Sequence, residues 1–367
     1  MEYFKRLAAL LLVFISLSAD AQNEKEIDVV SIVDKEMNKV YPANEPGAAI
    51  VIMRGDSIIM NKGYGLADIN TKTKITPATN FNIASISKMF TATAILLLAE
   101  KGKLNLQDPI IKYLPDVNPQ IGNKITIYHL LTHTSGLPHF IPTKDSATRF
   151  TVMDQETYDS DKNIDSLDFE PGTRFGYSNV GYRWLALITE KVSGVDFGDF
   201  VRKNVFLKAG MTNSYEMNRD APIINFAHAY QKTGNEFIEF DYGEEEQFGT
   251  LGDGGVVSST NDLISWEKAL RSYKVLSQKS FEETITPHIN SGLVVIGSSY
   301  GFGWFIQKSP NGGPMIYSHS GADGGFAAYL LRIPEKQIMV AFLSNRSDHV
   351  IDVAYSVQSL LRKAGWY

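Results

Sequence analysis

Two serines in the chain are followed, three residues later, by a lysine: Ser85 by Lys88 and Ser265 by Lys268. On a helix, this spacing places the hydroxyl and the amine one turn apart on the same face. A lysine that is kept neutral can accept the proton of a neighbouring serine and so create a nucleophile. Because so short a motif also occurs by chance, its surroundings decide which copy can do chemistry.

The first copy lies in an apolar setting. Residues 89–99, MFTATAILLLA, are apolar or small on nearly every side, which predicts a helix buried all round that ends at Gly102. Burial favours the neutral amine, and lowering the pKa of Lys88 from ~10.4 to near 7 costs about 4 to 5 kcal/mol. The alternative is a structural Lys88 whose stem carries its charge to the surface.

The second copy lies within TNDLISWEKALRSY, residues 260–273. Its apolar residues recur at helical spacing, and Thr260 is placed as an N-cap. This pattern is typical of an ordinary surface helix. We therefore expect Ser265 and Lys268 to have no part in chemistry.

A tyrosine and an asparagine form the next cluster. Tyr177 and Asn179, in the sequence YSN, directly precede a helical pattern that ends at Gly194. Both side chains could assist a serine nucleophile. A capping asparagine beside a buried tyrosine would give the same pattern, so this cluster alone leaves the two interpretations open.

The third cluster is either a Lys-Thr-Gly at residues 232–234 or a His-Ser-Gly that begins at His319. Gly234 and Asn235 separate two short strand-like segments, so the Lys-Thr-Gly is predicted to lie in a hairpin. The His-Ser-Gly instead ends the strand-like segment PMIYS and leads through Ala322 towards another strand. A backbone edge at that point could face a bound substrate.

The elements that must position these clusters come from both ends of the chain. Residues 26–41 have mostly helical spacing, and residues 47–65 read as two strands that turn at Gly55 and Asp56. Further strand-like segments precede a final helix; they are residues 300–308, 313–321, 324–334 and 336–345. We expect an α/β fold of the α+β type, in which helices flank an antiparallel sheet made from both ends and a mostly helical lobe is inserted.

The predicted boundaries follow from these elements. One domain spans residues 22–367, with an α/β lobe at about 22–80 and 290–367 and a helical lobe at about 81–289. Residues 138–172 form the longest irregular stretch, which is long enough to predict a functional loop over a site.

Composition restricts the setting of the protein. Residues 1–21 combine Lys5 and Arg6 with an apolar run and a small-residue end, which predicts a cleaved signal peptide, a mature chain from about Gln22, and a periplasmic or secreted protein without a transmembrane anchor. The 367 residues include no cysteine, which excludes disulfides and thiolate chemistry. A net charge of −6 with scattered cations argues against nucleic acid as a partner.

Two metal sites are considered and set aside. The histidines of HLLTHTSGLPH have partly metal-like spacing but lack the glutamate of a zinc helix; they are His129, His133 and His139. The acidic stretch DSDKNIDSLDFE has the oxygen-ligand spacing of a calcium loop, with Ile164 where a glycine must turn the chain. We expect neither a metal nor an organic cofactor.

With its three clusters in order, the sequence resembles the penicillin-recognising serine hydrolases, in particular the class C β-lactamase branch with its D-alanyl-D-alanine peptidases and esterases. Further segments similar to that branch are HLLTHTSGLP, FEPGTRFGYSNVGYRWLALITEKVSG, NVFLKAGMTNS, GDGGVVSSTNDLISW and YGFGWF. Together they cover most of residues 45–345. The resemblance implies a β-lactamase/transpeptidase-like fold.

The resemblance also implies roles for individual residues. Ser85 would be acylated, with Lys88 as its proton acceptor or an electrostatic aid. Tyr177 would act as general base and acid, and Asn179 would position Lys88 and the substrate. The strand-borne third motif would be His319, Ser320 and Gly321, and the backbone N–H groups of the oxyanion hole would belong to Ser85 and Ala322.

One departure concerns the substrate. The β-lactamases of this branch usually have Lys-Thr-Gly where this chain has His319, and a histidine is mostly neutral at pH 7. We therefore expect a peptide amide or small ester, as in a D-alanyl-D-alanine carboxypeptidase or an esterase acting on a small molecule or a cell-wall peptide. The alternatives are a class C type β-lactamase and a non-catalytic ligand-binding or sensor protein that keeps the fold.

Overall fold

The computed structural model describes residues 28–139, 158–159, 161–217, 224–240, 251–293, 297–309, 312–348 and 350–367. The predicted signal peptide and residues 140–157 of the predicted 138–172 loop lie outside these ranges. Across the described part of the chain, no helix has both the length and the apolar character needed to cross a membrane. The predicted N-terminal helix is described over residues 28–40.

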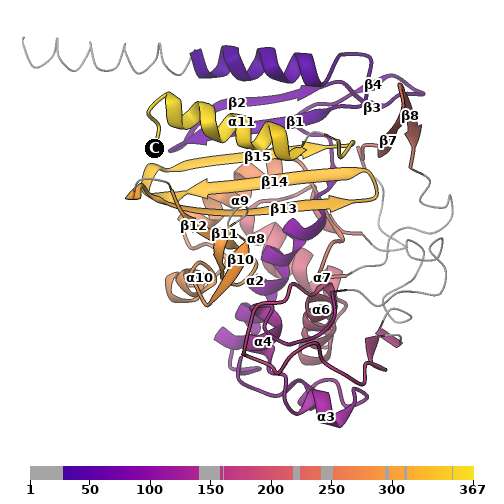
Figure 1. The fold of residues 1–367 in the computed structure, drawn as a ribbon, viewed down its shortest axis with the longest axis vertical. Helices are drawn as coiled ribbons and strands as arrows, with labels where there is room; N and C mark the ends of the chain where they lie inside the picture. The colour runs from indigo at the N-terminus through magenta and orange to yellow at the C-terminus, as the bar shows by residue number, and fades with distance from the viewer. Residues whose placement is uncertain are drawn as a thin grey trace, which may run out of the picture.

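An eight-stranded antiparallel sheet forms the upper part of the molecule, in the order β10-β11-β12-β13-β14-β15-β1-β2 (Figure 1). Its strands are β1 (Ala48–Arg54), β2 (Ser57–Tyr64), β10 (Ile289–Leu293), β11 (Gly297–Tyr300), β12 (Phe305–Lys308), β13 (Met315–Asp323), β14 (Phe326–Ile333) and β15 (Ile338–Ser344). β1 pairs with β15, so the two ends of the chain meet within one sheet. The expected fold class is confirmed.

Both faces of the central strands are buried. On β1, Val51 joins the core cluster that contains the helices of the lower lobe, whereas its neighbours Ile50 and Ile52 join the cluster beneath the N-terminal helix and α11 (Val350–Lys363). Successive side chains of a strand point to opposite faces, so a strand covered on both faces must be apolar throughout. This explains the continuous apolar run of residues 48–53.

The segment at 300–308 is not the single strand that the sequence predicts. Residues 301–304 form a turn in which the Gly301 N–H donates to the Trp304 carbonyl, and β11 and β12 lie on either side of it. Gly303 has φ of +79°, and a side chain there would lie 2.9 Å from the Lys88 carbonyl oxygen. The turn therefore packs against the helix that carries Lys88.

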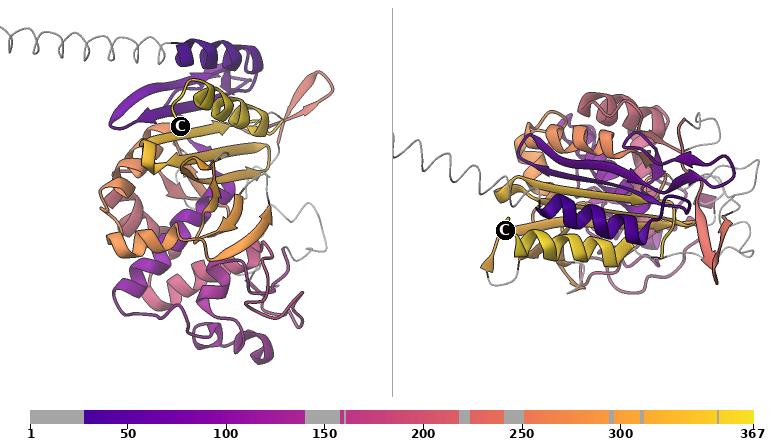
Figure 2. Two further views of the ribbon diagram at one scale, coloured as in Figure 1. Left: turned by 60° about the vertical axis from the view of Figure 1, so that its left-hand side comes forward. Right: turned by 90° about the horizontal axis from the view of Figure 1, so that it is seen from above.

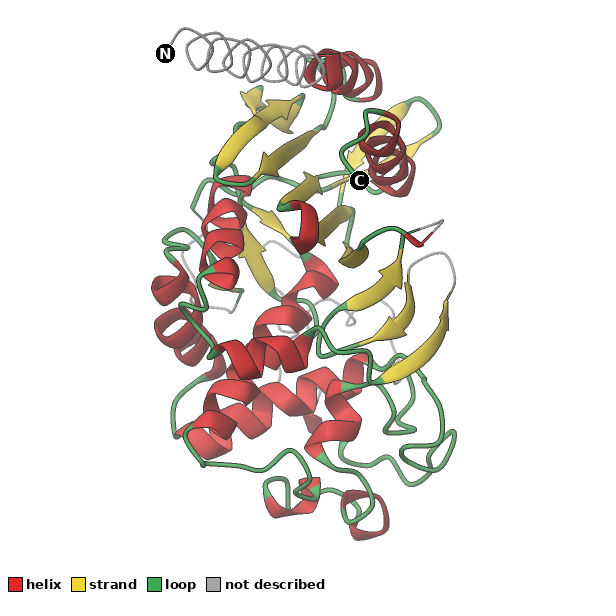
Figure 3. Cartoon of the chain, turned by 90° about the vertical axis from the view of Figure 1, so that its left-hand side faces the viewer, coloured by secondary structure: helices red, strands yellow, loops and turns green. Residues whose placement is uncertain are grey.

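Most of the remaining helices gather below the sheet (Figure 3), and α9 (Thr260–Arg271) packs against β1 and β15. The others are α2 (Ser87–Glu100), α3 (Pro119–Gly122), α4 (Ile127–Leu131), α6 (Asn179–Ser193), α7 (Phe197–Val201), α8 (Leu207–Ala209) and α10 (Gln278–Thr284), with single turns at η1 (Ala84–Ile86), η2 (Ile110–Lys112) and η4 (Arg202–Phe206). α2 is buried at every residue from Ser87 to Leu98, and Gly102 follows its end with φ of +63°. The predicted helix buried all round is confirmed.

Smaller sheets fix the chain near the junction of the lobes. The pairings are β5-β9-β6, β3-β4 and β7-β8, formed by β3 (Leu66–Asp68), β4 (Thr73–Lys74), β5 (Phe81–Asn82), β6 (Tyr215–Glu216), β7 (Tyr230–Thr233), β8 (Glu236–Glu239) and β9 (Val256–Ser258). A last single turn, η6 (Pro334–Lys336), joins β14 to β15. β7 and β8 turn at Gly234 and Asn235, so the predicted hairpin at the Lys-Thr-Gly is confirmed.

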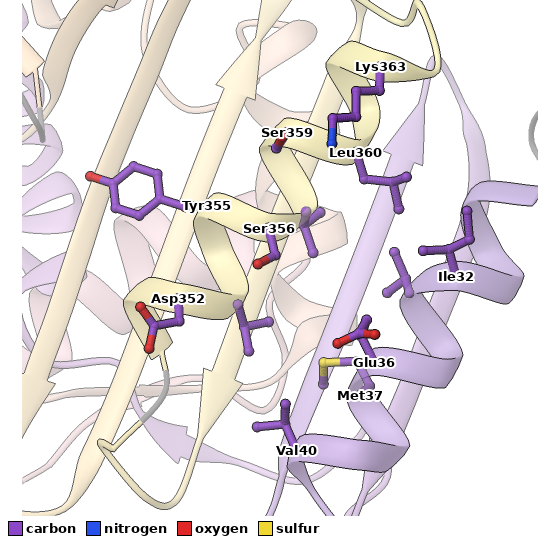
Figure 4. A pocket seen from close by; sticks show the side chains of 13 residues that line it. Ile32, Glu36, Met37, Val40, Asp352, Tyr355, Ser356, Ser359, Leu360 and Lys363 are labelled. Atoms are coloured by element: carbon purple, nitrogen blue, oxygen red, sulfur yellow. The ribbon is translucent and has the colours of Figure 1, made fainter.

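The N-terminal helix and α11 cover the other face of the sheet (Figure 2). Between them lies an open groove of about 610 Å³, lined by apolar residues such as Ile32, Met37 and Leu360 and by the charged Glu36, Asp352 and Lys363 (Figure 4). None of the predicted site residues lines this groove. The candidate chemistry lies elsewhere, where η1 meets β13.

Candidate active site

Ser85 lies in the single turn η1, two residues before the start of the α-helix that the sequence predicts to contain it. Ala84 precedes it with φ of +47°, a backbone region that costs about 1–2 kcal/mol for a residue with a side chain. The Ala84 N–H donates to Asn82 Oδ1 at 2.7 Å, which supports this turn. Ser85 is thereby presented at the start of α2, still one turn from Lys88.

Lys88 is completely buried and makes three hydrogen bonds. Its Nζ lies 3.0 Å from Ser85 Oγ, 2.7 Å from Asn179 Oδ1 and 2.7 Å from the Asp253 carbonyl oxygen. Burial lowers the pKa of Lys88 to about 7, the Asp253 charge opposes this shift, and the Arg183 charge adds to it. Neutral and charged forms are therefore both accessible near physiological pH.

The hydrogen bonds of Lys88 fix the direction of the lone pair on its neutral amine. The amide oxygen of Asn179 and the carbonyl oxygen of Asp253 can only accept, so they take both N–H groups of a neutral amine. The remaining lone pair then faces Ser85 Oγ at 3.0 Å. Lys88 is thus oriented to accept the serine proton when neutral, and to donate to Oγ when charged.

Tyr177 lies near Ser85 and Lys88. Burial raises the pKa of its phenol well above the usual value, and the Ser85 side chain opposes this shift. Lys88 Nζ lies 5.0 Å from the centre of its ring. At neutral pH the Tyr177 side chain is therefore a protonated phenol, suited to donate a proton.

Asn179 is the first residue of α6, but it does not cap the helix. Ser178 is the N-cap, and its side chain accepts from the Gly181 N–H at 3.3 Å. The interpretation of YSN as an Asn cap is thus wrong. Because the serine satisfies the helix end, the Asn179 amide is available to Lys88.

His133 supports Tyr177, a role that the sequence did not indicate. The two rings stack with centres 4.2 Å apart, and His133 Nδ1 accepts the Ser178 N–H at 3.1 Å. Burial lowers its pKa well below 6.5, so the ring is neutral. α4 ends at Leu131 and His133 follows with φ of +55°, so it does not share a helix face with His129.

The other histidines of that segment also have hydrogen-bond partners. His129 Nδ1 accepts the Thr126 N–H at 3.2 Å, and His139 Nδ1 lies 3.0 Å from the Tyr177 carbonyl oxygen. Over the described ranges, no three His, Cys, Asp or Glu side chains are grouped as a metal site would require.

His319 lies on β13 and is 1% exposed. Its Nδ1 lies 2.7 Å from the Ser320 carbonyl, which can only accept, so Nδ1 carries the proton and Nε2 accepts from the Tyr300 hydroxyl at 3.2 Å. Burial, with a contribution from the Lys88 charge, lowers the pKa of His319 to about 3. His319 is therefore an uncharged, fixed ring and supplies no cation for a substrate carboxylate.

The next residues of β13 lie against the backbone of the serine. A Cβ on Gly321 would lie 2.3 Å from the Ile83 carbonyl oxygen and 3.1 Å from Ser85 N, so only glycine fits. Among the described strands, β12 pairs with β13 only from Met315 to Ser318, whereas β14 continues to pair with β13 as far as Asp323. The edge from His319 to Ala322 thus continues past β12, beside Ser85.

The acidic stretch considered as a calcium loop contributes a buried ion pair instead. Arg183 donates through Nε and Nη2 to the Asp161 carboxylate, each at 2.9 Å, and its Nη1 lies 3.8 Å from Asp253 Oδ2. Neither Arg183 nor Asp253 was identified from the sequence. They are far apart along the chain, and only the fold brings them to Lys88.

The second Ser-x-x-Lys copy lies on α9, as predicted. Ser265 Oγ donates to the Asn261 carbonyl of its own helix at 3.5 Å, and Lys268 is exposed. The N-cap is Ser259, which accepts from the Asp262 N–H, and not Thr260 as the sequence suggested. This pair has neither the burial nor the supporting groups of the first.

Comparison with known proteins agrees with this arrangement. A family model described as Beta-lactamase matches residues 35–356. Penicillin-binding protein 4* of Bacillus subtilis (strain 168) is 34% identical over 86% of this chain and 70% of its own length, and Protein flp of Staphylococcus aureus (strain MRSA252) is 28% identical over 90% of this chain. This chain spans 64% of the length of Protein flp.

A solved structure has the same fold. The octameric penicillin-binding protein homologue from Pyrococcus abyssi superposes with a TM-score of 0.80 at 29% identity, covering 92% of this chain and 77% of that one. The similarity extends over the sheet and the helical lobe together, so it includes the junction at which Ser85 lies.

Proposed function

Because the chain belongs to the Beta-lactamase family, we propose that it is a serine hydrolase that forms an acyl-enzyme on Ser85 and releases it with water. The observation that carries this is the fully buried amine of Lys88, 3.0 Å from Ser85 Oγ, with its two other hydrogen bonds made to obligate acceptors. A buried, partly neutral lysine beside a serine is an activated pair.

Acylation begins with proton transfer from Ser85 to neutral Lys88 while Oγ bonds to the substrate carbonyl carbon. The backbone N–H groups of Ser85 and Ala322 stabilise the resulting oxyanion, a contribution of about 3 to 4 kcal/mol for each such donor. As the carbon–nitrogen or carbon–oxygen bond breaks, the phenol of Tyr177 protonates the leaving group. The Lys88 ammonium then returns a proton to Tyr177.

Deacylation repeats these steps with water. The water oxygen bonds to the acyl carbon, Lys88 accepts its proton, and Ser85 Oγ leaves and is reprotonated. The raised pKa of Tyr177 supports a role as proton donor, and the pKa of Lys88 near 7 supports the lysine as the principal base. No metal or organic cofactor enters these steps.

The substrate we propose is a peptide amide or a small ester, such as a cell-wall peptide that ends in D-alanyl-D-alanine. The β13 edge from His319 to Ala322 supports an extended substrate, because a strand edge offers backbone hydrogen bonds. The uncharged His319 supplies no charge attraction for a substrate carboxylate, which a β-lactam and a D-alanyl-D-alanine peptide both carry, so it favours an ester or an amide without a free carboxylate. A class C type β-lactamase is the second candidate.

The test is a comparison of turnover for three substrates: an acetylated D-alanyl-D-alanine peptide, a p-nitrophenyl ester and a chromogenic cephalosporin. We expect peptide or ester hydrolysis to exceed cephalosporin hydrolysis, and Ser85→Ala to abolish it. Efficient cephalosporin hydrolysis with feeble turnover of the other two would favour the β-lactamase. Binding of a cell-wall peptide without any turnover would favour a ligand-binding or sensor protein.

The proposal includes export to the periplasm or the medium. It is supported only by the sequence of residues 1–21, with its two cations, apolar run and small-residue end. Expression of the full chain in a bacterium, followed by mass spectrometry of the mature protein, tests it. A mature N-terminus near Gln22 is expected, and an intact chain retained in the cytoplasm would contradict export.

A further inference from the structure

The loop at residues 251–255 is fixed beside Lys88. The Thr91 hydroxyl donates to the Gly252 carbonyl at 2.6 Å, and the Gly252 N–H donates to Glu216 Oε1 at 2.9 Å. Lys88 itself donates to the Asp253 carbonyl at 2.7 Å. These bonds tie the loop to α2 and β6, so the position of Asp253 relative to Lys88 is set by the fold.

Asp253 is the first member of a charge chain, the series of three buried charged side chains Asp253, Arg183 and Asp161. Its side chain is 6% exposed, that of Arg183 is 10% exposed and that of Asp161 is 1% exposed. Arg183 joins the two carboxylates, with two hydrogen bonds to Asp161 and a 3.8 Å ion pair to Asp253. In the described part of the chain Asp253 Oδ1 has no hydrogen-bond partner, although a buried carboxylate usually requires several.

The charges of the charge chain and of Lys88 sum to zero only when Lys88 is protonated. Burial raises the pKa of Asp253 and raises that of Asp161 to about 6, and the Arg183 charge opposes both shifts. When both carboxyls are ionised they supply two negative charges and Arg183 one positive charge, so the three together are negative by one. A charged Lys88 makes the set neutral. In a buried setting, such an imbalance strongly affects the proton affinity of the neighbouring amine.

We propose that Asp253 and Arg183, with Asp161 holding the arginine in place, set the pH at which Lys88 changes from a cation to the base for Ser85. This inference rests on the proposed acyl-enzyme function. The three residues are positioning residues, because they act on the reaction through Lys88. Asp253 stabilises the cation, whereas Arg183 favours the neutral amine.

Other groups also face Lys88. Asp323 on β13 adds a negative charge that favours the cation, and the rings of Tyr177 and Tyr182 lie 5.0 and 5.6 Å from Nζ. His319 and His133 lie close enough for the Lys88 charge to lower their pKa values, and both are neutral near pH 7. Among these neighbours, Asp253 and Arg183 exert the two largest charge effects on Lys88.

Variants of opposite sign test the proposal. Asp253→Asn keeps the size of the side chain and removes its charge, so the protonation midpoint of Lys88 should fall by about one pH unit. Arg183→Gln should raise the midpoint by about as much, and Arg183→Lys should keep it near that of the wild type. A role in packing alone would not move the midpoint in two directions.

The midpoint is measured by NMR of protein labelled at the lysine ε-carbon, with the Lys88 signal assigned by its loss in Lys88→Met. The rate of Ser85 labelling by a fluorophosphonate is then followed against pH in the same variants, and its acidic limb should move with the midpoint. Asp262→Asn is the matched control: it removes another buried carboxylate, which bonds Ser214 and the Asn213 N–H, and should leave the midpoint unchanged.

An unchanged protonation midpoint of Lys88 in folded Asp253→Asn and Arg183→Gln would overturn the proposal. A shift of the midpoint without a matching shift in the acidic limb of the Ser85 labelling profile would overturn it as well. If Asp253→Asn does not fold, Asp161→Asn is used in its place; it removes the Asp161 charge that offsets Arg183 and should lower the midpoint. Failure of wild-type Ser85 to react would contradict the proposed function instead, while the NMR titration would still report on the charge chain.

Discussion

The two Ser-x-x-Lys copies show how one spacing gives two outcomes. On α2, Lys88 is completely buried, reaches Ser85 and has two further acceptors, whereas on α9 Lys268 is exposed and Ser265 bonds its own helix. Both copies have the same residue types in the same order. The burial of the amine and the groups that direct its lone pair distinguish them.

The surroundings of the first copy come from four separate parts of the chain. The continuous segment of η1 and α2 supplies the pair, α6 supplies Asn179, the 251–255 loop supplies the Asp253 carbonyl, and β13 supplies Gly321. The second copy depends on the single helix α9. A serine and a lysine become a nucleophile and its base only when the tertiary structure removes water and fixes the lysine.

Removing the two serines should break the comparison most strongly. Ser85→Ala deletes the proposed nucleophile, so kcat/KM for an ester or peptide substrate should fall by about 10⁴-fold or more. Ser265→Ala should stay near the wild-type value, because its hydroxyl only bonds a backbone carbonyl. Steady-state kinetics on both purified variants measures this. Equal losses of kcat/KM in the two variants would mean that Ser85 is wrongly identified as the nucleophile.

Removing the two lysines should give the next largest difference. Lys88→Met removes the base and should lower kcat/KM by about 10³-fold, within the range usual for general-base catalysis. Lys268→Met changes an exposed side chain and should have no measurable effect on turnover. An active Lys88→Met variant would indicate that Tyr177, and not Lys88, is the base.

Glycine substitutions compare the backbone around the two copies. Gly321→Ala would place a methyl group 2.3 Å from the Ile83 carbonyl, so β13 and η1 must separate, and kcat should fall by about 100-fold. Gly210→Ala, beside Ser265, meets nothing closer than 3.8 Å but has φ of +87°. It should reduce stability by about 1 kcal/mol and leave kcat unchanged, as thermal unfolding and kinetics can show.

The pH dependence of acylation should follow Lys88. The neutral amine is the active form and its pKa is about 7, so the rate should rise about tenfold per pH unit below 7 and level off above it. The raised pKa of Tyr177 predicts no loss of its proton on the alkaline side up to pH 9. The rate of Ser85 labelling, measured before steady state at several pH values across this range, gives the pH profile. A flat profile from pH 5 to 9 would contradict the role of Lys88.

The helix caps should give the smallest difference. Ser178→Ala and Ser259→Ala each remove an N-cap, from α6 and α9 respectively, and each should lower the free energy of unfolding by about 1 kcal/mol. Only Ser178→Ala should also reduce kcat, because α6 begins with Asn179. Denaturant unfolding measures the loss of stability in each variant. Equal kcat values in the two variants, at equal loss of stability, would show that the start of α6 does not position Lys88.

The sequence predicted the parts that depend on local pattern. The apolar run after Lys88 identified the buried helix, and the strand patterns at both ends identified the sheet. Strands β10 and β11 were missed, because residues 289–300 are short, glycine-containing and only partly apolar. The Ala84 turn was missed as well, because an alanine gives no sign of a positive φ.

The parts that depend on distant contacts could not be predicted. Asp161 was considered only as a calcium ligand, since its partner Arg183 is specified by packing and not by spacing. The complete burial of His319 was equally hidden, because a strand pattern does not show what covers the strand. The histidine was expected to be mostly neutral, and its burial makes it fully so at pH 7.

The most direct test of the central claim is intact-protein mass spectrometry after reaction with a fluorophosphonate, with peptide mapping of the adduct. A single adduct on Ser85, absent from Ser85→Ala and retained in Ser265→Ala, is the predicted result. An adduct on Ser265, or no adduct on a folded sample, would contradict the claim that burial and its supporting groups make the first copy the nucleophile.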